Sequence, residues 1–222
     1  MDENQDGAAG TAPLLQAIPD LGLLLGVAFA DAVFRDSPWH GEGHWRAVAK
    51  AGLELARYDS RVDLTVVFLF AVLHDTCREN ENYDPGHGPR AALKASELAG
   101  TAFYLSGEQQ DVLETALGVH TESERYESQP TIAACLDADR LDFWRLGECP
   151  QERFMSTPAA RGELFDLGKR LHVDQPSWQE LFDAYASLQM ERELALGTAE
   201  PNLSPQEARD RSEPLDVGGI DW

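Results

Sequence analysis

One adjacent pair of residues, His74-Asp75, offers the clearest chemistry in this sequence. Two further candidate ligands flank the pair, with His44 upstream and Asp139 downstream. Imidazole nitrogens and carboxylate oxygens together suit Mn, Fe, Ni, Co or Zn, and such a metal acidifies water and polarises a phosphoryl oxygen. The four residues therefore predict a site for a divalent transition metal, and we also count Asp75 among the catalytic residues.

The residues around these ligands resemble the motifs of a known family. The segments "HGEGHWRAV" around His44, "FAVLHDTCR" around the His-Asp pair and "CLDADRLDF" around Asp139 are similar to three motifs of the HD-domain superfamily of metal-dependent phosphohydrolases. The resemblance covers residues 40–147, about half of the chain. It implies a helical bundle, a metal site and hydrolysis of a small phosphorylated molecule, a nucleotide being one option. In the last motif the family ligand is the Asp before Arg-Leu, which is Asp139 rather than Asp137.

Two more histidines, His87 and His120, leave the number of metal ions open. Some members of the family bind two metals with ligands in the order His, His-Asp, His, His, Asp, and this sequence reproduces that order. The short spacing from Asp75 to His87 favours one metal instead, in which case His87 would bind substrate phosphate and His120 would transfer a proton. His40 lacks the motif that follows His44, so we expect it to support the site rather than bind the metal.

Charged residues after the His-Asp pair are the candidates for substrate binding and catalysis. Lys and Arg together number only 18, so those near the motifs are informative. We expect Arg78, Arg90 and Lys94 to bind phosphate, and Arg140 to neutralise the aspartates beside it. The family usually has its catalytic acid where this chain has Arg78. Glu79, the next residue, is therefore the candidate general base, although one residue along a helix changes direction by about 100°.

Two other functions remain open on the residues alone. The order His, His-Asp, His, His, Asp also resembles that of HD-type di-iron oxygenases. These enzymes use oxygen to cleave or oxidise a small polyol or phosphonate. A non-catalytic HD protein that binds a ligand is the third alternative, because Arg78 replaces the usual acid. Two bound irons would favour the oxygenase, and an intact metal site without turnover would favour the binding protein.

The pattern of apolar residues predicts helices around the candidate ligands. Glu42 to Tyr58 carries apolar residues at helical spacing, and Leu64 to Leu73 is apolar throughout. We therefore expect the second segment to be a helix buried on all sides that ends at the His-Asp pair. Ser106 and Gln109 form a predicted capping box. Further helices are predicted at 21–34, 89–104, 107–120, 131–143 and 177–196. No segment offers a convincing strand partner, so the predicted fold class is all-α.

Length and composition fit one globular domain with flanking tails. The chain has 222 residues, of which 43% are hydrophobic, enough to bury a core. We expect a disordered N-terminus over residues 1–13, a single HD-type helical domain over 14–196 and an acidic, disordered tail over 197–222.

Charge and cysteine content bear on partners and compartment. A formal net charge of -21 repels phosphate backbones, so nucleic acid is not an expected partner. The longest apolar runs are too short to span a bilayer. The three cysteines are widely spaced, and the N-terminus is acidic where a secretory signal would be basic, so a cytoplasmic protein is expected. A homodimer is the default expectation from the frequency of dimers alone.

Overall fold

The computed structural model describes residues 17–122, 124–171, 173 and 175–197. The predicted disorder of residues 1–13 and nearly all of the predicted tail fall outside these residues. Within them, helices account for the regular structure apart from an isolated bridge between Ala99 and Phe103, which confirms the all-α fold class. The chain divides into two compact units, Met1–Tyr185 and Ala186–Trp222, and every candidate site residue lies in the first.

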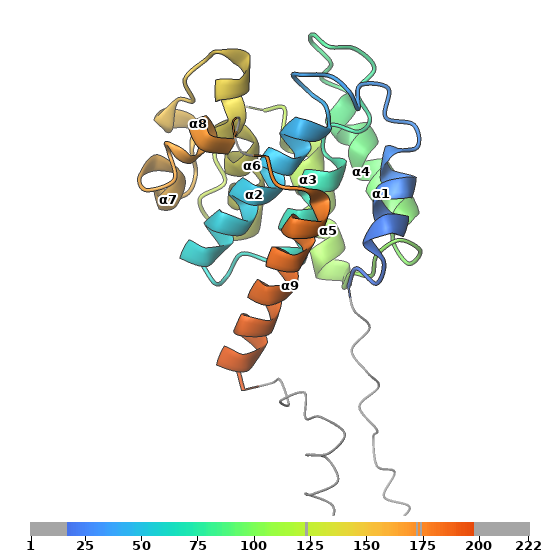
Figure 1. Ribbon diagram of the computed structural model, residues 1–222, viewed down its shortest axis with the longest axis vertical. Coiled ribbons are helices and arrows are strands. Elements are labelled where there is room, and N and C mark those ends of the chain that lie inside the picture. The colour runs from blue at the N-terminus through green and yellow to red at the C-terminus, as the bar shows by residue number, and fades with distance from the viewer. Residues whose placement is uncertain (1–16, 123, 172, 174, 198–222) are drawn as a thin grey trace, which may run out of the picture. The chain divides into compact units, whose positions relative to one another are not determined.

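The predicted central helix is α3, Leu64–Leu73, and every residue in it is buried. The prediction of a helix buried on all sides is therefore confirmed. The helices that pack most closely against α3 precede the short helices of the chain (Figure 1). They are α1 (Leu21–Phe29), α2 (Glu42–Tyr58), α4 (His87–Leu98), α5 (Gly107–Val119) and α6 (Pro130–Leu141).

Helices α2 and α3 approach each other unusually closely. A Cβ atom at Gly52 in α2 would lie only 2.3 Å from Cγ1 of Val67 in α3, so the absence of a side chain at Gly52 permits this contact. Because successive helices joined by a short loop run antiparallel, the start of α2 lies beside the end of α3. This arrangement brings His44 and His74 together.

The other helix predictions are confirmed in part. The capping box at Ser106 and Gln109 is present at the start of α5. Helix α4 begins at His87, before Pro89, and ends at Leu98 instead of running to residue 104. The early end has a physical reason, because Gly100 adopts a positive φ of 77° that turns the chain out of the helix. Helix α1 likewise ends at Phe29 rather than at residue 34.

The segment after α6 consists of short helices and is held to the bundle by polar side chains. These helices are η1 (Asp142–Leu146), η2 (Glu152–Phe154), α7 (Pro158–Arg161) and α8 (Leu167–Leu171), and the long α9 (Trp178–Ala195) follows them. Arg140 was predicted to neutralise the aspartates beside it, but it donates to the backbone carbonyls of Phe154, Glu122 and Glu124, and its ion pair with Asp137 is long, at 3.9 Å. Asp137 accepts the backbone N–H groups of Ser156 and Thr157.

Two further observations concern membrane-spanning helices and the cysteines. Among the described residues, none of the helices combines the length and the apolar character that crossing a bilayer requires. The three cysteines, which are all described, carry free thiols.

Candidate metal centre

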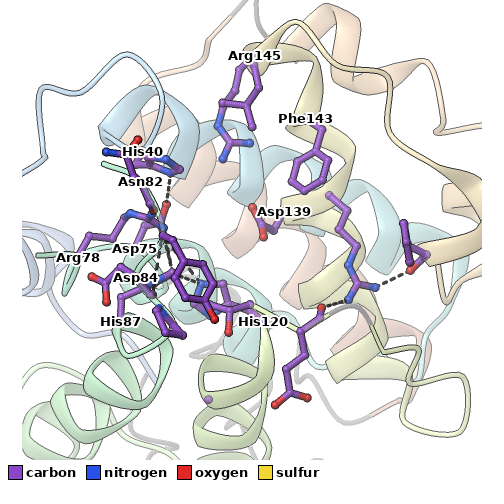
Figure 2. Close-up of a pocket in the computed structure, with 18 of the residues that line it drawn as sticks. His40, Asp75, Arg78, Asn82, Asp84, His87, His120, Asp139, Phe143 and Arg145 are labelled. Atoms are coloured by element: carbon purple, nitrogen blue, oxygen red, sulfur yellow. Dashed lines mark hydrogen bonds and ion pairs between the residues drawn. The ribbon is translucent and has the colours of Figure 1, made fainter. Parts of the chain in front are cut away.

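The candidate ligands lie at or close to helix ends. His44 is in the first turn of α2, His74 and Asp75 follow the last residue of α3, and Asp139 lies near the end of α6. His87 is the first residue of α4, and His120 directly follows α5. Figure 2 shows Asp75, His87, His120 and Asp139 gathered in one pocket.

The first group of ligand atoms joins α2, α3 and α6. The Nε2 atoms of His44 and His74 are 3.2 Å apart, and His44 Nε2 is 3.1 Å from Oδ1 of Asp139. Oδ2 of Asp75 lies 3.9 Å from both Nε2 atoms. His44, His74 and Asp75 are therefore close enough to share an ion, and Asp139 lies beside this group through its contact with His44.

The second group uses the other oxygen of Asp75. Oδ1 of Asp75 lies 3.0 Å from Nε2 of His87 and 3.8 Å from Nε2 of His120. The two Nε2 atoms of this pair are only 2.7 Å apart. Asp75, His87 and His120 therefore form a second set that is close enough to share an ion, and Asp75 belongs to both sets.

All four histidines are anchored through Nδ1. His44 Nδ1 lies 2.8 Å from Oδ2 of Asp142. The other three Nδ1 atoms lie 3.2, 2.5 and 2.7 Å from backbone carbonyl oxygens, those of Ala71 for His74, Asp84 for His87 and Leu117 for His120. Each of these acceptors lacks a hydrogen, so the Nδ1–H group donates and Nε2 carries the lone pair.

The arrangement of lone pairs calls for a cation. In each set, two Nε2 lone pairs face each other across about a hydrogen-bond length beside a carboxylate oxygen. Lone pairs at this separation repel unless a proton or a metal ion lies between them. The side chains are almost fully buried, so water does not relieve the repulsion. Nδ1 anchored to a carbonyl or carboxylate, with Nε2 facing inward, is the usual arrangement of metal-binding histidines. The buried His/Asp cluster therefore has the geometry to hold a metal ion.

The pKa shifts show that the carboxylates of the cluster favour positive charge on neighbouring imidazoles. Burial lowers the pKa of His74 to about 3, so its imidazole is neutral near pH 7. Burial alone would raise the pKa of Asp75, yet the histidines around it hold that pKa well below its usual range. For His120, the carboxylate of Asp75 outweighs burial and raises the pKa. The pKa of His44 is also raised, because Asp139 and Asp142 outweigh burial and the charge of Arg145.

The cluster forms one wall of a cavity of about 670 Å³. Arg78 and Arg145 line this cavity, with side chains only 7% and 4% exposed. His40 also lines it, and its Nδ1 lies 3.3 Å from Oδ2 of Asp75, in keeping with the supporting role predicted for it. The cavity is large enough for a small-molecule substrate.

Three of the predicted site residues are not brought into this cavity. The side chain of Glu79 is 72% exposed and lies 3.7 Å from Arg90, on a separate hollow of the surface. Arg90 donates to Asp84 and to the carbonyl of Cys77, and Lys94 donates to the carbonyl of Ala28. The roles predicted for Glu79 as base and for Arg90 and Lys94 as phosphate ligands therefore have no support from the geometry.

Sequence reasoning missed three contributors to the site. Asp142 was not selected as a site residue, yet its carboxylate accepts from His44. Asp84 supplies the carbonyl that anchors His87, and Arg145 enters the cavity from η1. One signal was available for two of them, since Asp142 and Arg145 both lie within six residues of the predicted ligand Asp139.

The hydrogen bond from His44 to Asp142 yields a testable prediction. Asp142→Asn should weaken metal binding by about 10- to 100-fold, because an amide is a poorer acceptor for Nδ1–H and polarises the imidazole less. The measurement is a metal titration in competition with a chromophoric chelator. Asp137→Asn is the matched control on the neighbouring stretch of chain, since the partners of Asp137 among the described residues are Ser156 and Thr157, at the start of α7, and Arg140. Equal loss of affinity in both variants would mean general destabilisation rather than a role at the metal site.

Comparisons with known proteins add nothing to this geometry. No protein-family model, curated protein or solved structure matches the chain. The resemblance to HD-domain motifs therefore stays a prediction, and any function has to be argued from the buried cluster and the cavity beside it.

Proposed function

We propose that this protein is a metal-dependent phosphohydrolase of the HD type that acts on a small phosphorylated molecule. The observation that carries the proposal is the convergence of four imidazole Nε2 atoms on the two oxygens of one carboxylate, Asp75. The motif order His, His-Asp, His, His, Asp supports the same assignment from the sequence.

The geometry favours two ions over the single ion that the short spacing from Asp75 to His87 suggested. His44, His74, Asp75 and Asp139 would hold the first, and Asp75, His87 and His120 the second. His87 and His120 then act as ligands rather than as groups that contact substrate, because their Nε2 atoms face each other. When bound, divalent transition metals in such a site supply Lewis acidity, which acidifies water and polarises a phosphoryl oxygen.

Arg78 is the residue of this chain best placed to bind the reacting phosphate. Its Nη1 lies 3.3 Å from Oδ1 of Asp75 and 3.3 Å from Nε2 of His87, while Nη2 donates to the carbonyl of Asn82. These bonds fix a cation at the edge of the cluster, facing the cavity. A guanidinium held in this way can bind phosphoryl oxygens and stabilise the negative charge that develops on them.

Proton transfer falls to His40 in this proposal. Glu79 lies outside the cavity, and His120 faces His87. His40 is the imidazole among the described lining residues that the metal sites do not require. Its Nδ1 lies beside Asp75, so the ring can hold a proton next to the reacting centre and deliver it to the leaving group.

The test is hydrolysis of a broad panel of phosphate esters, including nucleotides and sugar phosphates. Protein loaded in turn with Mn, Fe, Ni, Co or Zn should release phosphate from at least one of them. Asp75→Asn, which removes the charge shared by both sets of ligands, should lower the rate by about 1000-fold. Arg57→Met is the control, since Arg57 pairs with Glu54 at the far end of α2.

A second candidate, a di-iron oxygenase of the HD type, shares the feature that Asp75 belongs to two ligand sets. The buried guanidinium groups of Arg78 and Arg145 in the cavity favour an anionic substrate over an uncharged polyol, so an oxygenase at this site would act on a phosphonate. Oxygen consumption by the iron-loaded protein, without release of phosphate from any ester, would favour the oxygenase. Stoichiometric metal binding without either reaction would leave a ligand-binding protein.

A further inference from the structure

Arg145 is a buried cation in the cavity to which the proposed reaction gives no role. It lies in η1, and Figure 2 shows it reaching the cavity on the side of Asp139, whereas Arg78 lies on the side of Asp75 and His87. The two guanidinium groups therefore approach the metal cluster from different elements and different sides.

The Arg145 side chain is held in place by backbone carbonyls. Nε donates to Trp39 O at 2.5 Å, and Nη1 donates to Asp142 O at 3.1 Å. A guanidinium has five N–H donors, so these two bonds leave donors for a ligand in the cavity. Because the guanidinium is already fixed, binding an anion costs little of the conformational entropy of the Arg145 side chain.

The charge of Arg145 is incompletely matched by its neighbours. Among the described residues, the carboxylate oxygen nearest to Arg145 is Oδ2 of Asp142, which is 3.9 Å from Nη1 and is already bonded to His44 at 2.8 Å. Asp139 lies on the same side, but it is a proposed metal ligand, so a bound ion would neutralise its charge. A guanidinium that is only 4% exposed needs a negative partner, and a ligand anion can supply it.

The same turn of chain offers an apolar surface for the organic part of a substrate. Phe143 and Leu146 of η1 line the cavity with Arg145, and Phe154 and Met155 line it from the segment around η2. A substrate whose phosphate is held at Arg78 and the metals would extend its organic part along this wall, where Arg145 lies.

We propose that Arg145 is a specificity residue that binds a second anionic group of the substrate. The substrate is then a small phosphate ester whose organic part carries a carboxylate or another acidic group. This inference rests on the proposed function, because it takes the metal cluster and Arg78 as the site of the reacting phosphate. The competing interpretations are that Arg145 binds that same phosphate, or that it only ties η1 to the segment around Trp39.

The test measures binding by calorimetry with non-hydrolysable probes and the metal-loaded full-length protein. The probes are phosphonoacetate, 3-phosphonopropionate and 4-phosphonobutyrate, each beside its carboxamide, which has nearly the same shape and keeps the phosphonate but lacks the carboxylate charge. Wild-type protein should bind at least one acid about 10-fold or more tightly than its amide. Arg145→Met should abolish this preference and leave amide binding within about 2-fold of wild type. Arg145→Lys should retain part of the preference.

The outcomes separate the interpretations. Equal weakening of acids and amides in Arg145→Met would mean that Arg145 binds the reacting phosphate, and a preference that persists in this variant would place the second anion elsewhere. Either result, or the absence of any preference in the wild type, overturns the inference and leaves the proposed function standing. Failure of every phosphonate to bind the metal-loaded protein would also overturn the inference, whereas the proposed function is decided separately by the release of phosphate from the ester panel. If Arg145→Met does not fold or load metal, the wild type and Arg145→Lys still decide the question.

Discussion

Protein purified without chelator is expected to carry about two equivalents of a divalent transition metal, and Asp75→Ala is expected to lose both. The expectation follows from the position of Asp75, whose two oxygens face different pairs of histidines. Without the carboxylate, each pair of histidines loses the negative charge that it shares with the other pair. Elemental analysis by mass spectrometry, beside protein concentration from absorbance, gives the stoichiometry directly.

Single histidine variants should separate the two sites. His74→Ala should lose the ion held with His44 and Asp139, and His87→Ala the ion held with His120, each with at least about a 100-fold loss of affinity. The remaining ion should stay bound in each case, because the two groups share only Asp75. Complete loss of metal in both variants would mean that the two sites do not bind independently.

His40→Ala is the matched control for the metal prediction. His40 contacts Asp75 through Nδ1 and precedes α2, whereas the four histidines proposed as ligands point Nε2 into the cluster. The His40 variant should therefore keep both ions while its turnover falls. Metal loss in this variant would make His40 a ligand. A wild-type protein without metal, even after reloading with Mn, Fe, Ni, Co or Zn, would contradict the proposed site.

Arg78→Met is expected to lower kcat/KM for any phosphate ester that the protein hydrolyses by about 100-fold or more. The reason is the loss of a buried, fixed cation beside Asp75 and His87, where negative charge develops on the phosphoryl oxygens. Arg78→Lys should recover only part of the rate, since an ammonium group keeps the charge without the planar fork. Steady-state kinetics with metal-saturated protein make the comparison.

Metal content distinguishes substrate binding by Arg78 from a purely structural role. If Arg78 binds the phosphate, Arg78→Met should keep both ions. If Arg78 only positions Asp75, the variant should lose metal affinity as well as rate. Arg57→Met, at an exposed ion pair, should match the wild type in both measurements. An Arg78→Met enzyme with unchanged kcat/KM would remove Arg78 from the mechanism.

Much of the scaffold around the site was readable from local sequence patterns. Helix α2 spans Glu42–Tyr58 and α3 spans Leu64–Leu73, as their apolar periodicity and continuous apolar run predict. The capping box of Ser106 and Gln109 is an interaction within one turn, so it too was predictable. Helix ends were predicted less well where one backbone angle decides, as at Gly100 after α4.

The sequence by itself determined the residue types and their order, which is why His44, His74, Asp75 and Asp139 could be selected as one set. The tertiary structure decided which side chains meet. Packing of α4 against α5 brings His87 and His120 to the second oxygen of Asp75, although 33 residues separate the two histidines. The short spacing from Asp75 to His87 had argued against this second site. That argument failed because loop length alone does not reveal where the next helix begins.

The same limit applies to the charged residues around the cluster. The chain leaves regular helix after Leu73, and from there the backbone path sends Arg78 into the cavity and leaves Glu79 exposed. Asp142 and Arg145 reach the site because η1 folds back against α2. Periodicity fixes the face of a helix on which a residue lies, whereas its partners across elements depend on how the helices pack, and only the tertiary structure supplies that information.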